Sequence, residues 1–357
     1  DNEVIEIGVK LIEDLNKKYS TENDFPIFHF LYRKRQWNEK ENCYLGWERK
    51  RGMIMQFNEY ILGNEENKFR INTMEQYKDC LPKFKYVITL DADTDLILNS
   101  AFELVGAMAH ILNQPVIDEE KNMVIEGYGI IQPRIGIHLD VAYKSLFTQI
   151  FAGSGGIDSY TNAISDVYQD NFGEGIFTGK GIYNLAVFSK ILKNAIPENT
   201  VLSHDLLEGC YLRCGLATDI MLMDGYPTKY NSFMNRLSRW IRGDWQIISW
   251  LGKYVTNRKE RIRNPLNCLS KYKIFDNLRR SLIEIAVIIS CVFLLIFGKI
   301  YMFKIYPFIC ISLLSVIISN ILEIFNNMIL KKEGEHKQKK FSPRISGYKG
   351  IGLRIVL

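Results

Sequence analysis

The chain has 357 residues, of which 47% are hydrophobic and 24% are charged, and this balance excludes an intrinsically disordered protein. The formal net charge is only +5, so the chain lacks the strong basic character of nucleic-acid-binding proteins, and we expect no nucleic-acid partner. Basic residues gather instead beside two apolar stretches near the C-terminal end, which indicates that membrane lipids are the anionic partner.

In the first half of the chain, segments of helical spacing alternate with short apolar runs. Helices are predicted over 1–20, 53–62 and 99–112. In the last of these we expect the packed side chains to be Phe102, Val105, Met108 and Leu112. Strands are predicted over 25–32, 86–90 and 124–132.

The second half continues the alternation of helices and strands. A glycine-rich, polar stretch over 153–181 predicts a long binding loop. A helix over 202–216, with Ser203 as its N-cap, precedes a strand over 217–223 and a helix over 231–252. This order predicts an α/β domain with a mainly parallel, Rossmann-like sheet.

The composition changes after Arg280. Two apolar runs, 281–298 and 305–325, each have about the 20 residues that a helix needs to cross a bilayer. Basic residues flank both runs, which by the positive-inside rule predicts a transmembrane helical hairpin with both flanks in the cytoplasm. The alternative is a buried helical hairpin in a soluble domain.

Asp91 and Asp93 are the first candidates for chemistry. They are separated by one residue and directly follow the strand predicted over 86–90. Ligands of open α/β sheets bind at the carboxyl ends of strands, and a cation that bridges a diphosphate prefers hard carboxylate oxygens. The alternative is a solvated turn.

His204 and Asp205 form the second candidate site. A general base for a sugar hydroxyl is a carboxylate or a histidine, and Asp205 stands near a predicted helix N-terminus, where the helix dipole favours its charged form. Simple capping of the helix is the alternative.

Arginine and tryptophan share one face of the helix predicted over 231–252. Arg236, Arg239 and Trp240 could hold a diphosphate through guanidinium groups and stack a sugar ring on the indole. The alternative is an amphipathic helix beside a membrane surface.

The segment from Gly173 to Gly181 is rich in glycine, which permits close backbone approach to a ligand. It does not fit the Walker pattern, because a glycine follows Lys180. We expect Thr178, Gly179 and Lys180 to contact donor or acceptor; a flexible structural loop is the alternative.

The order of these segments resembles the processive inverting glycosyltransferases of the GT-A fold, which include cellulose and hyaluronan synthases. In the amino-acid sequence of these segments, the chain is most similar to the glycosyltransferase domain of cyclic β-1,2-glucan synthases over about residues 25–285. The segments that carry this likeness are Gly46-Trp-Glu-Arg-Lys-Arg-Gly52, Tyr86-Val-Ile-Thr-Leu-Asp-Ala-Asp-Thr94, Phe172-Gly-Glu-Gly-Ile-Phe-Thr-Gly-Lys-Gly-Ile-Tyr183, Leu202-Ser-His-Asp-Leu206 and Arg239-Trp-Ile-Arg-Gly-Asp-Trp-Gln246.

This resemblance implies a UDP-glucose donor, a growing β-1,2-glucan as acceptor, and Mg²⁺ or Mn²⁺ as cofactor. It implies that Asp91 and Asp93 hold the metal and its diphosphate, and that Asp205 is the general base. Arg239 and Trp240 then occupy the R-W part of the Q-x-x-R-W motif, and Arg236 stands in place of its glutamine.

The resemblance also implies a domain order and a place in the cell. We expect a GT-A core over 1–265, a basic segment over 266–280, two membrane helices over 281–330 and a basic cytoplasmic segment over 331–357. The core would face the cytoplasm at a bacterial inner membrane.

The chain begins at Asp1 without a methionine, so we expect it to be part of a longer multidomain synthase. No strand that could hold the nucleotide is found before Phe25, and we expect that strand to lie upstream. A membrane glycosyltransferase of another specificity and an inactive scaffold fragment remain the alternative functions.

Overall fold

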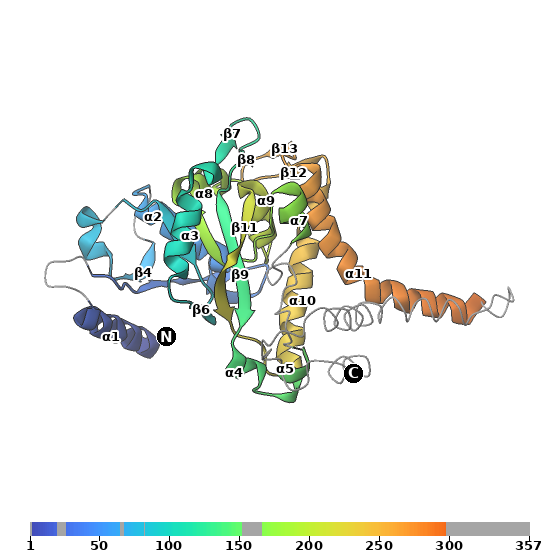
Figure 1. Cartoon of the computed structure of the whole chain (residues 1–357), viewed down its shortest axis with the longest axis horizontal. Helices are drawn as coiled ribbons and strands as arrows, with labels where there is room; N and C mark the ends of the chain where they lie inside the picture. The colour runs from blue at the N-terminus through green and yellow to red at the C-terminus, as the bar shows by residue number, and fades with distance from the viewer. Residues whose placement is uncertain (1, 20–25, 65–67, 82, 152–165, 298–357) are drawn as a thin grey trace, which may run out of the picture.

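The computed structural model describes residues 2–19, 26–64, 68–81, 83–151 and 166–297. Its centre is a five-stranded sheet covered by helices (Figure 1), so the predicted α/β class is confirmed. Across the sheet the strands are β5 (Tyr86–Thr89), β10 (Gly181–Asn184), β9 (Ile130–Ile137), β11 (Cys214–Asp224) and β6 (Thr94–Leu96).

The sheet is mixed, so the prediction of a mainly parallel sheet was wrong. β9 and β11 pair in parallel, but β10 runs antiparallel to both β5 and β9, and β6 runs antiparallel to β11. Although only residues 90–93 separate β5 from β6 in the chain, these two strands lie at opposite edges of the sheet and run in opposite directions.

Helices cover the two faces of this sheet, and the side chains of its strands alternate between them. On one face, Leu104 and Met108 of α3 (Ser100–Ala109) pack against Ile131 and Ile182. The preceding or following strand residues point the other way, toward α8 (Leu185–Leu192) and α9 (Asp205–Leu212). The hydrophobic core therefore has two parts, one on each side of the sheet.

The buried face of α3 differs from the expected one. Met108 is buried as predicted, but Leu104 is its partner, while Phe102 is 82% exposed. Leu104 and Met108 are four residues apart and so lie on one helical face. The helix ends at Ala109, which leaves Leu112 outside it and exposed.

The N-terminal third adds small elements beside the sheet (Figure 1). They are α1 (Asn2–Tyr19), β1 (Leu31–Arg33), β2 (Arg35–Asn38), β3 (Cys43–Gly46), α2 (Arg49–Ile61), β4 (Phe69–Asn72) and η1 (Glu75–Cys80). β1 pairs with β4, and β2 forms a hairpin with β3. The strand predicted over 25–32 is thus shorter and begins later, at Leu31, because residues 26–30 do not pair with β4.

The other elements connect or follow the strands of the sheet. They are η2 (Ile111–Asn113), β7 (Val116–Asp118), β8 (Met123–Glu126), α4 (Leu139–Ala142), α5 (Leu146–Phe151), α7 (Val167–Phe172), α10 (Tyr230–Gln246), η3 (Ile248–Leu251), β12 (Tyr254–Thr256) and β13 (Arg261–Arg263). The last helix is α11 (Cys268–Phe297).

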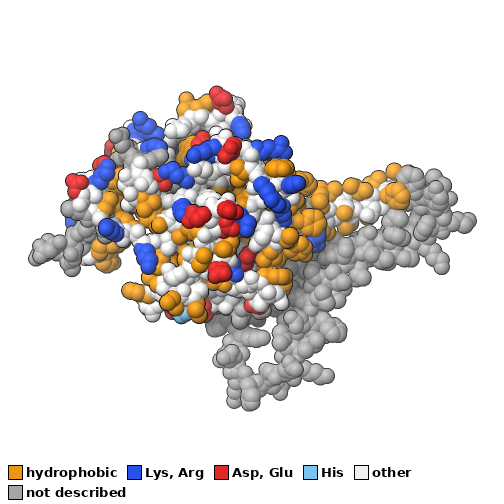
Figure 2. All heavy atoms as spheres, turned by 90° about the horizontal axis from the view of Figure 1, so that it is seen from above, with side chains coloured by type: hydrophobic (Ala, Val, Ile, Leu, Met, Phe, Trp, Pro, Cys, Tyr) orange, Lys and Arg blue, Asp and Glu red, His pale blue; other side chains and the backbone are white. Residues whose placement is uncertain are grey.

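The first half of α11 belongs to the domain, and its second half leaves it (Figure 1). Ile274 and Leu278 are buried in the core, whereas Ile288 and Phe293 are 64% and 58% exposed. Figure 2 shows hydrophobic side chains along this arm.

The predicted transmembrane hairpin is not supported by the structure. Within the described ranges, no helix combines the length and the hydropathy required to cross a membrane. The first expected span, 281–298, is described as far as Phe297 and continues a helix that starts at Cys268 and packs against the domain through Ile274 and Leu278. The second, 305–325, falls outside the described residues.

Gly181 provides a test of how the sheet is assembled. Its φ is +149°, and an added Cβ would lie 2.2 Å from the carbonyl oxygen of Ile131 on the neighbouring strand. Gly181→Ala should therefore lower the free energy of unfolding by about 2–3 kcal/mol in urea titrations, because the backbone of the sheet has to move. Gly106→Ala is the control: its Cβ would meet nothing within 4 Å in α3, so it should leave stability unchanged or raise it by about 1 kcal/mol. Equal effects of the two substitutions would contradict this account.

Candidate functional site

Asp91 and Asp93 lie in the turn between β5 and β6. β5, β9 and β11 run in the same direction, so this turn lies at the carboxyl edge of those strands. The position is the one expected for ligand-binding side chains in an α/β sheet.

The carboxylate of Asp91 is surrounded by positive charge. Lys50, in the first turn of α2, forms an ion pair with it and also donates a hydrogen bond of 2.7 Å to the carbonyl oxygen of Gly179. Lys180 places its Nζ 3.4 Å from Asp91 Oδ2. Burial by itself raises the pKa of Asp91, but the two ammonium groups outweigh it, so the pKa lies below its usual value.

Asp224, the last residue of β11, completes this charge cluster. It is 3% exposed, forms an ion pair with Lys180 and accepts a hydrogen bond of 2.6 Å from the hydroxyl of Thr94. Lys180 is therefore held between Asp91 and Asp224. Lys180 was predicted as a binding residue; Asp224 and Lys50 were not.

Asp93 faces α10 rather than the lysines. Its Oδ2 lies 3.4 Å from a guanidinium nitrogen of Arg236, and that guanidinium lies over the ring of Trp240 at 5.7 Å from the centroid. Arg239 is on the exposed surface of the same helix. The structure thus brings Arg236, Trp240 and the Asp93 turn together.

The C-terminal part of α10 is packed against the segment that precedes Asp205. An added Cβ on Gly243 would lie 2.4 Å from the Cβ of Ser203, and the side chain of Gln246 accepts a hydrogen bond of 2.7 Å from the amide of Leu202. The helix that carries Arg236 therefore also fixes the approach of the chain to Asp205.

Asp205 is the first residue of α9, and its carboxylate lies against the backbone of Gly179. Gly179 has a φ of +90°, and an added Cβ would lie 2.9 Å from Asp205 Oδ1. The predicted N-cap, Ser203, is replaced by His204, which makes no side-chain capping bond. The close contact between Gly179 and the Asp205 carboxylate, together with the positive φ, explains why a glycine is needed at position 179.

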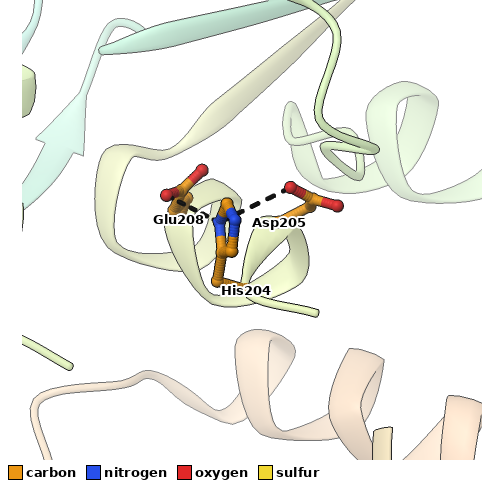
Figure 3. A group of neighbouring side chains, drawn as sticks. All are labelled: His204, Asp205 and Glu208. Carbon is orange, nitrogen blue, oxygen red and sulfur yellow. Dashed lines mark ion pairs between the residues drawn. The ribbon is translucent and has the colours of Figure 1, made fainter. Parts of the chain in front are cut away.

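His204 is buried beside Asp205 and does not face solvent. Figure 3 shows its ring between two carboxylates: Nδ1 lies 2.8 Å from Glu208 and 3.5 Å from Asp205. His204 is 6% exposed and Glu208 is 1% exposed. Burial alone lowers the pKa of His204, but the negative charges of Glu208 and Asp205 outweigh it and raise the pKa above its usual value.

Two sets of residues have the chemistry to hold a divalent metal. Among the described residues, ligand atoms of His204, Asp205 and Glu208 lie within 4.8 Å of one another. A metal there would compete with the proton that the raised pKa of His204 favours. Asp91 and Asp93 also offer the hard carboxylate oxygens that Mg²⁺ or Mn²⁺ prefers. Asp91 is paired with Lys50 and Lys180, and Asp93 lies beside Arg236, so a cation bound there would share these carboxylates with basic side chains.

Thr178 is joined to the sheet by both of its polar donors, and its predicted contact with donor or acceptor stays a prediction. Its amide and its hydroxyl both donate to the side-chain oxygen of Gln132, at 2.9 and 3.1 Å, and Gln132 is fully buried in β9. This pair of bonds holds the glycine-rich segment against the sheet.

The local sequence gives only a partial signal for Lys50. It stands in a run of four charged residues, Glu48 to Arg51, in which Glu48 and Arg51 are buried and form an ion pair with each other, whereas the side chain of Lys50 is 34% exposed. Charged residues are rarely buried without a partner. Such a dense run of charges indicates contacts within the fold, but it does not identify Asp91 as the partner of Lys50.

Comparison with known proteins gives one informative relative. No family model matches the chain. It is 42% identical over 288 residues to the cyclic β-(1,2)-glucan synthase NdvB of Rhizobium meliloti (strain 1021). The match covers 80% of this chain but only 10% of the relative. The relationship predicted from the sequence segments is thereby confirmed.

The lowered pKa of Asp91 predicts how Lys50→Met behaves with pH. A carboxylate whose pKa is depressed in the folded state stabilises the fold above its unfolded pKa of about 4, and this stabilisation is lost as the pH falls through the folded value. The melting temperature of Lys50→Met should therefore be lower than that of the wild type near pH 7, and the two should converge below about pH 4.

Lys190→Met is the control for this comparison. It removes an exposed ion pair with Glu119 and should have a small effect at every pH. A deficit of Lys50→Met that stays constant down to pH 3 would show that its pairing with Asp91 is not the cause.

Proposed function

The chain is related to a cyclic β-(1,2)-glucan synthase, and we propose that it is the glycosyltransferase part of a longer synthase of that kind. In this proposal it transfers glucose from UDP-glucose, with inversion, to a growing β-1,2-glucan chain. The relationship supports the sugar and the linkage, and the arrangement of the charged residues supports the transfer reaction.

One contact carries the proposal: Lys50 joins the Asp91 turn to the segment that touches Asp205. Its Nζ pairs with Asp91 and donates to the carbonyl oxygen of Gly179, and Gly179 packs against the Asp205 carboxylate. An inverting transferase needs charge stabilisation for the leaving diphosphate beside a base for the acceptor hydroxyl. The two contacts of Lys50 bring the charged groups around Asp91 and the proposed base, Asp205, into one site.

In the reaction, Asp205 accepts the proton of the glucan hydroxyl as that oxygen attacks the anomeric carbon of glucose. Lys180 and Arg236 stabilise the negative charge on the departing UDP, together with Arg239. Trp240 offers a face for a sugar ring. A divalent cation, Mg²⁺ or Mn²⁺, held by Asp91 and Asp93 would supply further charge stabilisation to the diphosphate.

We further propose that this site works at the cytoplasmic face of a bacterial inner membrane. The exposed apolar side chains of α11, such as Ile288 and Phe293, and the basic residues Lys271, Arg279 and Arg280 before them support contact with anionic lipids.

The proposal is tested by incubating membranes that contain the full-length synthase with radiolabelled UDP-glucose and Mn²⁺. The activity that incorporates label into a β-1,2-glucan should sediment with the membranes, and EDTA should abolish it. Asp205→Asn should lose about 10²- to 10⁴-fold of the rate, because no base remains, and Asp93→Ala should lose its metal-dependent activity. Asp95→Asn, a neighbouring exposed carboxylate paired with His138, is the matched control and should retain the rate.

Other outcomes separate the alternatives. Transfer from a different nucleotide sugar, lost in the same variants, would keep the mechanism but replace the substrate. No transfer from any donor and no metal-dependent UDP binding would leave the scaffold function.

Gly179→Ala tests the contact between the glycine-rich segment and the base. The added Cβ would displace the Asp205 carboxylate, and misplacement by about 1 Å costs on the order of 10²-fold in rate. UDP binding should remain. Gly106→Ala serves as the control, and an active Gly179→Ala enzyme would be inconsistent with Asp205 acting from this position.

A further inference from the structure

Two buried side chains next to Asp205 have no part in the mechanism above. Glu208 lies one helical turn after His204 in α9, and the carboxylate is almost completely enclosed. An isolated buried charge is costly, so Glu208 needs the imidazolium of His204, 2.8 Å away, as its partner. The pair is therefore an internal feature of the site rather than a surface ion pair.

The two oxygens of Asp205 have different surroundings. Oδ1 is buried, has no hydrogen-bond partner among the described residues, and lies 3.5 Å from Nδ1 of His204. The side chain as a whole is still 27% exposed. Oδ2 is therefore the oxygen left open to a substrate.

Other charged groups around the pair balance each other. Arg51 of α2 opposes the positive charge of His204, but Arg51 is itself paired with Glu48. On β10, the hydroxyl of Tyr183 lies near Glu208 and donates to Asn58. Glu208 and Asp205 are thus the groups that attract His204 most strongly.

We propose that His204 and Glu208 are positioning residues for Asp205. Glu208 holds the imidazolium in place, and the imidazolium keeps Oδ1 of Asp205 turned inward, so that Oδ2 faces the acceptor. This assignment rests on the proposed function, because it gives the pair a role in placing the base.

The test is Glu208→Gln in the full-length synthase, assayed as above across a range of pH. The variant should lower kcat about 10- to 100-fold, while KM for UDP-glucose and metal-dependent UDP binding stay the same. Activity of the wild type should fall as the pH rises through the raised pKa of His204. Without Glu208 this fall should move to lower pH, because the main negative partner is gone.

A second readout does not depend on activity. The chain contains five histidines, so labelled imidazole resonances can be assigned by comparison with His204→Gln. Glu208→Gln should lower the pH at which the His204 ring loses its proton. Glu174→Gln is the control, since it removes another buried carboxylate, which is paired with Lys273 and not with His204.

The outcomes distinguish this proposal from the proposed function. An inactive wild type would overturn the function, whatever the resonances show. An active wild type with unchanged kcat and pH profile in Glu208→Gln would overturn the positioning role. A loss of rate equal to that of Glu174→Gln, with no shift of the pH profile, would mean that Glu208 serves only the fold.

Discussion

Mutual neutralisation of charge at the carboxyl edge of the sheet is the constraint on which the site depends. Two acids, Asp91 and Asp224, alternate there with two bases, Lys50 and Lys180. The side chains of Lys180 and Asp224 are only 10% and 4% exposed. Removing one partner of such a buried pair costs about 3–5 kcal/mol, because it leaves an uncompensated charge. Lys180 and Asp224 therefore depend on each other, and together with the more exposed Lys50 and Asp91 they join four segments of the chain.

The glycine-rich segment is held at both ends as a result. Near its start, Lys273 of α11 pairs with Glu174 and donates to the carbonyl oxygen of Gly175 at 3.0 Å. Near its end, Lys50 donates to Gly179. Glycine in this segment therefore serves close packing rather than mobility. Lys273 thus connects α11, and Lys50 connects α2, to the segment that contains Gly179, the residue that touches Asp205.

The sequence predicted those parts of the site that follow directly from local pattern. Asp91 stands after a strand, and Asp205 stands at a helix start, because each position is set by residues within a few places of it. Lys50 and Asp224 reach the same cluster from 41 residues before and 133 residues after Asp91, and no local pattern reports such distances. His204 was predicted to contact the substrate. Sequence spacing does not reveal that its ring turns inward toward Glu208. The alternation of helices and strands predicted the fold class but not the antiparallel direction of β10.

The position of Asp205 is set by backbone contacts as much as by charge. Gly179 lies against its carboxylate, and Gly243 brings α10 against Ser203 just before it. A third glycine, Gly209, lets α9 approach Phe177, with only 2.9 Å between an added Cβ and the Phe177 Cβ. Contacts of this kind have no side-chain rotamers to lose, whereas a long side chain such as that of Lys50 has several torsions. Backbone packing thus fixes where α9 begins and therefore where the Asp205 carboxylate lies. His204 and the other charged groups then act on a carboxylate that is already held close to them.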